Sequence, residues 1–252
     1  MTLCLRQFGP SFLILVILSS VKLPWVQANV PKERSTVVEN VIRVESPSLP
    51  KAYEELKYYL STFKPTRKGQ RFPLLLALHG RGGNGRDYLD VWKDEADRRH
   101  VMVLAPTRTR GYSDEADDMV AFYRLVEEIV RQYPVARDKI FLAGDSSGAL
   151  VARWLVLSNP GGWKKVVFVS SPPFEQWEDL PDGGRLPPIL YVHGVADNQF
   201  KIEEIAGSVE TLRRRAFEAK LISYSDAGHE HRPEWNREIF DWLLGQDYSS
   251  IS

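Results

Sequence analysis

The stretch KIFLAGDSSGALVARWLVLS, residues 139–158, joins two different hydrophobic patterns across one short turn. Its first part is a nearly unbroken apolar run that ends at Asp145, and runs of this kind are typical of strands covered on both faces. Its second part, from Ser147 onward, spaces apolar residues as one face of a helix does. The stretch therefore predicts a strand, a tight turn at Ser146 and a helix.

The turn carries the pattern Gly-x-Ser-x-Gly, in which Gly144 and Gly148 lie on either side of Ser146. Small residues at these positions let the strand and the helix approach closely while the serine holds a strained backbone. The adjoining helix N-terminus favours developing negative charge. We therefore expect Ser146 to be a nucleophile, the alternative being a glycine- and serine-rich turn without chemistry. Ser147 does not fit the spacing and would supply a backbone N–H group.

Other parts of the chain repeat the alternation of strand and helix. Aliphatic runs predict further strands, and apolar residues at helical intervals predict helices between them. The runs are residues 35–44, 56–63, 72–80, 100–106, 164–172, 188–194 and, more weakly, 220–226, and the helical stripes span residues 119–133, 205–216 and 235–243. Alternation with short connections predicts an α/β fold with a mostly parallel sheet, in a single domain over residues 29–252.

A serine hydroxyl is a weak nucleophile and needs a general base that a third group orients. Asp197 follows the predicted strand at 188–194, and His229 follows the last predicted strand. The chain order Ser146, Asp197, His229 is the order expected on such a sheet, whose strands meet at one carboxyl edge. Asp226 and His231 are the neighbouring alternatives for the acid and the base. His79 and His193 follow strands and precede glycines, and both are expected to be structural.

A glycine-rich stretch, LHGRGGNG at residues 78–85, follows a central predicted strand. The backbone N–H groups of Arg81 and Ser147 would form an oxyanion hole there. The stretch lacks the Lys-Ser/Thr ending of a phosphate-binding loop and does not match Gly-x-Gly-x-x-Gly. No His, Cys and carboxylate cluster has zinc-like spacing, so we expect no metal and no cofactor.

Residues 1–28 have the pattern of a secretory signal peptide, with Arg6, a short apolar run at 12–18 and a small residue at Ala28. The run is shorter than the about 20 residues that span a membrane. We expect cleavage after Ala28 and a secreted or periplasmic protein, the alternative being an uncleaved anchor that makes a membrane-tethered interaction protein. Cys4, the single cysteine, would leave with this segment.

The charge balance excludes some partners at the level of the whole chain. Its 252 residues include 33 Lys and Arg and 33 Asp and Glu, for a formal net charge of zero. Such a balance gives no electrostatic reason to expect a nucleic acid or an anionic membrane as a partner. After signal cleavage we expect no stable membrane association, and we expect an ester, small or polymeric, as the substrate.

The stretches LHGRGGN, residues 117–155 and HGVADNQF resemble the α/β-hydrolase superfamily, and the likeness extends over about residues 56–244. They look most similar to the lipase/esterase branch, which includes polyhydroxybutyrate depolymerase-like and feruloyl esterase-like proteins and small phospholipase/carboxylesterases. The resemblance implies a central sheet with helices on both faces. It also implies a secreted serine hydrolase that cleaves carboxylic esters through an acyl-enzyme, with Ser146, Asp197 and His229 as its triad. A catalytically inactive extracellular binding protein and a peptidase with the same triad are the alternatives.

The chain departs from these relatives in three respects. Residue 147 is Ser where they often have Asn, Gln or Ala, and residues 29–252 lack the cysteines of many secreted depolymerases. Residues 174–186 are too few for the helical cap domain of many members, and an open site would fit a bulky or polymeric substrate. Trp177, Tyr112 and Phe200 are candidates for aromatic walls, or else packing residues.

Overall fold

The structure is a computed structural model that describes residues 34–43, 55–107, 115–180 and 183–246. The chain divides into Met1–Val30 and Pro31–Ser252, and every described residue belongs to the second part. The predicted signal peptide, residues 1–28, and Tyr112 lie outside the described residues. The expected boundary between residues 28 and 29 therefore stays a prediction. No helix within the described ranges has the length and hydropathy needed to cross a membrane.

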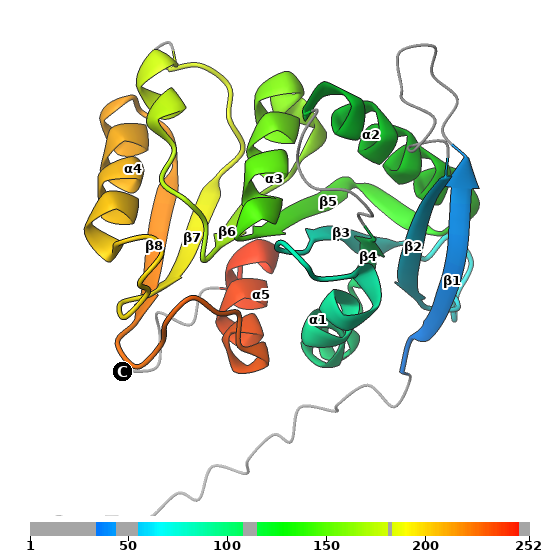
Figure 1. The fold of residues 1–252 in the computed structure, drawn as a ribbon. Coiled ribbons are helices and arrows are strands. Elements are labelled where there is room, and N and C mark those ends of the chain that lie inside the picture. Colours follow the sequence, from blue (N-terminus) through cyan, green and yellow to red (C-terminus); the bar gives the residue numbers. More distant parts are fainter. Residues whose placement is uncertain (1–33, 44–54, 108–114, 181–182, 247–252) are drawn as a thin grey trace, which may run out of the picture. The chain divides into compact units, whose positions relative to one another are not determined.

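The described strands form one eight-stranded sheet in the order β1-β2-β4-β3-β5-β6-β7-β8 (Figure 1). Strand β2 is antiparallel to both β1 and β4, and the remaining pairs are parallel. The expectation of a mostly parallel sheet is confirmed. The strands are β1 Thr36–Arg43, β2 Glu55–Thr62, β3 Phe72–Leu78, β4 Met102–Pro106, β5 Val135–Asp145, β6 Val166–Val169, β7 Ile189–Gly194 and β8 Ala219–Tyr224.

Helices cover both faces of the sheet, as Figure 1 shows, with α2, α3 and α4 on one face and α1 and α5 on the other. In β3, Leu74 and Leu76 join the core under the first group, while Leu75 and Ala77 join the second core. A strand buried on both faces must be apolar at every position, which explains the unbroken run. The helices are α1 Gly85–Arg99, α2 Glu115–Gln132, α3 Ser147–Ser158, α4 Ile202–Arg214 and α5 Asn236–Leu244.

Helix α1 is the one long element that the sequence prediction missed. Most residues of α1 are charged, so the apolar face that it turns toward the sheet is narrow. That face is built around Leu89, Trp92 and Ala96. Asn84 caps the helix, since its side-chain oxygen accepts a hydrogen bond from the Asp87 N–H at 3.0 Å. The sequence signal for this helix was an asparagine at the N-cap, followed by apolar residues at helical intervals.

Two smaller differences concern short helices. Trp235 belongs to a 3-10 helix, η4 Pro233–Trp235, rather than to α5. Between β6 and β7 the described residues hold a single five-residue 3-10 helix, η3 Glu175–Asp179. A segment this short contains no cap domain, as expected. A further 3-10 helix of the described residues is η2 Pro160–Gly162.

The junction of β3, β5 and α3 leaves no room for side chains. A Cβ atom on Gly148 would lie 2.2 Å from the carbonyl oxygen of Leu78, and one on Gly144 would lie 2.6 Å from the Gly148 oxygen. Both contacts involve backbone that cannot rotate away. The two glycines therefore allow the turn at Ser146 to pack directly against the neighbouring strand.

Gly148→Ala is expected to destabilise the protein by roughly 2 kcal/mol or more, because backbone must shift to admit the methyl group. Gly207→Ala is the matched control, since Gly207 lies within α4 with open space around it. That change is expected to stabilise the protein by roughly 0.5–1 kcal/mol. Urea unfolding of both variants checks the pair. Equal effects would show that the close contact at Gly148 does not constrain the fold.

Candidate active site

Ser146 sits in a strained turn between β5 and α3. Its backbone has φ 49° and ψ −117°, a conformation that residues other than glycine rarely adopt. The turn is held from both sides, since the Ser146 N–H donates to the Val169 oxygen at 2.9 Å and the Ser146 oxygen accepts the Ala149 N–H at 3.0 Å. Such a conformation costs about 1–3 kcal/mol, which the surrounding packing must offset.

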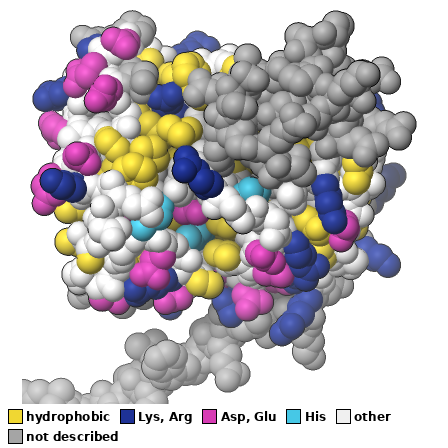
Figure 2. Space-filling model, viewed as in Figure 1, with side chains coloured by type: hydrophobic (Ala, Val, Ile, Leu, Met, Phe, Trp, Pro, Cys, Tyr) yellow, Lys and Arg dark blue, Asp and Glu magenta, His cyan; other side chains and the backbone are white. Residues whose placement is uncertain are grey.

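The structure brings Ser146, His229 and Asp197 together, although 83 and 32 residues separate the bonded pairs in the chain. His229 Nε2 lies 2.9 Å from Ser146 Oγ, and His229 Nδ1 lies 2.8 Å from Asp197 Oδ2. Because a carboxylate can only accept, we assign the imidazole proton to Nδ1, and Nε2 is left to accept the serine hydroxyl. On the face of the molecule drawn in Figure 2, histidine side chains reach the surface beside hydrophobic and acidic side chains.

Asp197 is fixed by several donors. Its side chain is buried, and Oδ1 accepts the N–H groups of Gln199 at 2.7 Å and Phe200 at 3.1 Å. Burial alone favours the protonated acid, but the hydrogen bonds from His229, Gln199 and Phe200 outweigh it, so the pKa of Asp197 lies below its usual value. The carboxyl is therefore an anion at neutral pH.

The neighbouring candidates have other partners. His231 Nε2 lies 2.8 Å from Asn236 Oδ1 and its Nδ1 lies 3.3 Å from the Tyr88 hydroxyl. Desolvation lowers the pKa of His231 to about 4, so this ring stays neutral. Asp226 is exposed and accepts a hydrogen bond from Arg232 at 2.8 Å. The geometry thus separates both residues from the Ser146 cluster.

Two of the remaining histidines contact backbone oxygens, as expected for structural residues. His193 Nε2 lies 2.8 Å from the Phe200 oxygen and 3.4 Å from Asp197 Oδ2. His79 Nδ1 lies 2.7 Å from the Gly80 oxygen. These contacts position the loops that carry Asp197 and the glycine-rich stretch.

The glycine-rich loop after β3 lies against the turn at Ser146. A Cβ atom on Gly80 would lie 2.9 Å from Asp145 Oδ2 and 3.3 Å from Ser146 Cβ. The Gly83 N–H donates to the Gly80 oxygen at 3.2 Å, and Gly82 adopts φ 76°, which closes the turn around Arg81. The loop that carries Arg81 is thus adjacent to the serine, while the oxyanion role of Arg81 and Ser147 stays a prediction.

Asp145 is a residue of this site that sequence reasoning did not single out. Its carboxylate accepts a hydrogen bond from the Gly80 N–H. Burial raises the pKa of Asp145 to about 7, against the opposing effects of the His229 charge and the Gly80 hydrogen bond. The position is the variable residue of Gly-x-Ser-x-Gly, so nothing in the motif marks it. Asp145 connects the turn at Ser146 to the glycine-rich loop.

The two described aromatic candidates differ. The Trp177 side chain is fully buried, and its Nε1 donates to the Tyr191 hydroxyl at 2.7 Å. Trp177 is therefore a core residue and not a wall of an open site. Phe200 is partly buried, and its ring centroid lies 5.6 Å from that of His229 in an edge-to-face contact. It borders the candidate base.

No protein-family model and no curated protein matches the chain. Solved structures do match it. A ferulic acid esterase gives a TM-score of 0.67 at 16% identity, over 84% of this chain and 97% of that one. Thermogutta terrifontis esterase 2, phosphorylated by paraoxon, gives 0.64 at 17% identity over 87% and 98%. S-formylglutathione hydrolase (FrmB) from Staphylococcus aureus gives 0.61 at 15% identity over 84% and 97%. With the eight-stranded, mostly parallel sheet, these likenesses show that the chain has the α/β-hydrolase fold.

Proposed function

We propose that this protein is a serine hydrolase that cleaves carboxylic esters through an acyl-enzyme intermediate. The observation that carries the proposal is the continuous hydrogen-bonded series from Ser146 through His229 to Asp197. It begins at a strained turn, and strain of this kind is typical of functional sites. The esterases among the similar structures support the same reaction class.

In the acylation step, His229 Nε2 takes the proton of Ser146 Oγ while the oxygen attacks the ester carbonyl carbon. The carbonyl electron pair moves to oxygen, which gives a tetrahedral oxyanion, and the Asp197 carboxylate stabilises the imidazolium. When the intermediate collapses, the bond to the alcohol oxygen breaks. His229 then donates its proton to the departing alkoxide, and the acyl group stays on Ser146.

In the deacylation step, His229 Nε2 takes a proton from a water molecule that attacks the acyl carbonyl. The second oxyanion collapses, the bond to Ser146 Oγ breaks, and the serine recovers its proton from His229. The carboxylic acid leaves and the starting state returns. The chain's own acid, base and nucleophile account for every proton in both steps.

The oxyanion of both steps needs preorganised donors. The Gly80 N–H is already bonded to Asp145, which leaves Arg81 as the donor of the glycine-rich loop. Ser147 opens helix α3, and N–H groups in the first turn of a helix have no intrahelical acceptor. The proposed hole therefore consists of the N–H groups of Arg81 and Ser147. Each such donor contributes about 10²–10³ in rate.

The substrate class follows from the openness of the fold near the site. Between β6 and β7 the described residues form one short 3-10 helix, where a cap domain would otherwise cover the carboxyl edge of the sheet. Phe200 next to His229 offers an aromatic surface to an acyl or aryl group. We therefore include bulky and polymeric esters among the proposed substrates.

Ser146→Ala is expected to abolish hydrolysis of p-nitrophenyl acetate, with a loss of about 10⁴-fold or more, because it removes the hydroxyl that lies against His229 Nε2. Asp197→Asn is expected to lower kcat by about 10⁴-fold, since the amide favours the wrong imidazole tautomer. Asp226→Asn is the control and should keep wild-type activity. Mass spectrometry after paraoxon treatment should place a phosphoryl adduct on Ser146. Unchanged activity in Ser146→Ala would refute the proposal.

Asp145→Asn is expected to change how stability depends on pH. The folded state raises the pKa of Asp145 from 3.8 to about 7, so folding favours the protonated acid, and stability is lost as pH rises between these values. Asparagine can still accept the Gly80 hydrogen bond but has no charge to bury. The variant should therefore gain stability relative to the wild type between pH 4 and 8, by roughly 3–4 kcal/mol.

Urea unfolding at pH 4 and at pH 8 measures this difference. Asp226→Asn is the control with the opposite sign, because the hydrogen bond from Arg232 lowers the pKa of Asp226. Its contribution is present at pH 8 and is lost as the pH falls, so this variant should lose stability relative to the wild type at high pH. Parallel pH curves for Asp145→Asn and the wild type would contradict the assignment.

Secretion is the remaining part of the proposal, and it rests on residues 1–28. Sequencing of the N-terminus of the protein after expression in a secreting host should find Asn29 as the first residue. An intact N-terminus on exported or membrane-bound protein would instead identify an anchor.

A further inference from the structure

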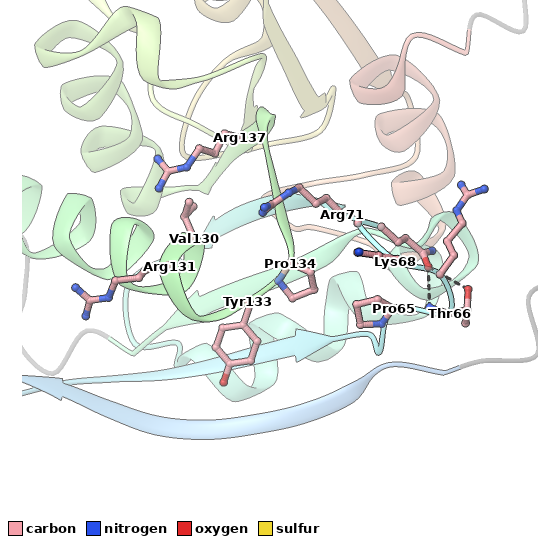
Figure 3. A pocket seen from close by; sticks show the side chains of 12 residues that line it. Pro65, Thr66, Lys68, Arg71, Val130, Arg131, Tyr133, Pro134 and Arg137 are labelled. Carbon is pink, nitrogen blue, oxygen red and sulfur yellow. Dashed lines mark hydrogen bonds between the residues drawn. The ribbon is translucent and has the colours of Figure 1, made fainter.

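A groove of about 890 Å³ lies at the amino end of β3, whereas Ser146 follows the carboxyl end of the neighbouring strand β5. It runs between the loop that joins β2 to β3 and the segment where α2 ends and β5 begins. The two sides are tied together, since the Phe72 N–H donates to the Pro134 oxygen at 2.7 Å. Figure 3 shows Lys68 and Arg71 extending from the loop toward Pro134, with Arg131 and Arg137 on the other side.

The groove concentrates positive charge in a chain whose net charge is zero. Its described lining contains five cationic side chains and no carboxylate, namely Arg67, Lys68, Arg71, Arg131 and Arg137. Two of them have acidic partners outside the lining, Arg131 with Glu128 and Arg137 with Glu127 at 3.5 Å. Within the part of the chain that the structure describes, Arg67, Lys68 and Arg71 have no carboxylate partner. The groove thus has an excess of three positive charges.

The loop that supplies these three cations has a defined conformation. The Thr66 N–H and hydroxyl both donate to Gln70 Oε1, at 2.8 and 3.0 Å, and the Gln70 N–H donates to the Arg67 oxygen at 3.2 Å. Gly69 adopts φ 77°, which closes the turn. Arg71 Nη1 donates to the Val135 oxygen across the groove at 3.3 Å. The cations therefore project from a fixed turn, which reduces the entropy lost when a ligand binds.

The chemistry of the lining selects among anionic ligands. Four of the five cations are arginines, whose planar guanidinium groups bind carboxylate and sulfate with two parallel hydrogen bonds. Tyr133 is the only aromatic residue of the described lining, whereas proteins that bind single-stranded nucleic acid typically stack successive bases on several aromatic side chains. The other apolar residues are Val130 and two prolines, which offer nothing large to insert into a membrane surface.

We propose that this groove binds a segment of an acidic polysaccharide, with its carboxylate or sulfate groups on Arg67, Lys68 and Arg71 and a sugar ring against Tyr133 and Pro134. Binding here leaves the candidate active site free, because β3 begins at the groove and ends at the glycine-rich loop. Its seven residues span roughly 20 Å. The site would hold the protein on an acidic polymer while Ser146 faces elsewhere. This inference does not depend on the proposed ester hydrolysis.

Isothermal titration of the full chain with oligogalacturonate and with a sulfated oligosaccharide tests the proposal. Binding of either is expected, with an affinity that falls between 50 and 200 mM salt. The double variant Arg67→Gln, Lys68→Gln should bind about tenfold or more weakly, because it removes two unpaired cations. Its matched control is Arg185→Gln, Lys220→Gln, which removes the same charge from exposed residues outside the groove and should bind as the wild type does.

Each other result overturns the proposal. These results are no binding of either oligosaccharide, equal binding of fully methyl-esterified oligogalacturonate, and equal weakening in both double variants. Binding only to single-stranded DNA or to phosphatidylglycerol vesicles would assign the groove to those partners instead. Hydrolysis of p-nitrophenyl acetate should be unchanged in both double variants. If no protein hydrolyses the ester, the proposed function fails, and the binding result still decides this site.

Discussion

The close contact of β3, β5 and α3 at two glycines is the constraint on which the rest of the site depends. With a methyl group at Gly144 or Gly148, the helix would have to move away from the strands. The contact holds Ser146 at positive φ, and it aims the first turn of α3 at the carboxyl edge of the sheet. The strain at Ser146 is local, and it is offset by packing that involves both faces of the sheet. The close packing of the two glycines and the position of the Ser146 hydroxyl therefore both follow from the contact of β3, β5 and α3.

Two carboxyl groups near His229 are driven in opposite directions by their surroundings. Asp197 accepts N–H groups from the imidazole and from two backbone positions, so its pKa falls. Asp145 has one backbone donor, and burial raises its pKa to about 7. The carboxylate that contacts His229 Nδ1 is thus distinct from the carboxyl group that ties the Ser146 turn to the glycine-rich loop. Environments that separate two such pKa values allow neighbouring carboxyl groups to play different parts.

The parts of the fold that could be predicted are those where a residue pattern in the sequence has one main structural cause. The aliphatic runs at β3, β5, β6 and β7 are buried on both faces, and such short runs bounded by turn residues are typical of central strands. The order of Ser146, Asp197 and His229 could be inferred because each follows a strand end. Helix α1 was missed because charged residues dominate it and its apolar face is narrow. Asp145 could not be found from the motif, since its importance arises from Gly80, which is far away in the sequence.

The carboxyl ends and the amino ends of parallel strands lie on opposite sides of a sheet, and in this chain the two sides carry different groups of side chains. At the carboxyl ends the loops after β5, β7 and β8 bring together Ser146, Asp197 and His229, along with glycine-rich backbone that follows β3. At the amino ends of β3 and β5 the turns need only connect elements, so their side chains are free to take on another role. The described lining of the groove there holds four arginines and a lysine and no carboxylate. Surface cations gain little from isolated ion pairs in water, whereas a series of anionic groups can engage several of them at once. The separation of the two ends would let the proposed polymer bind without obstructing Ser146.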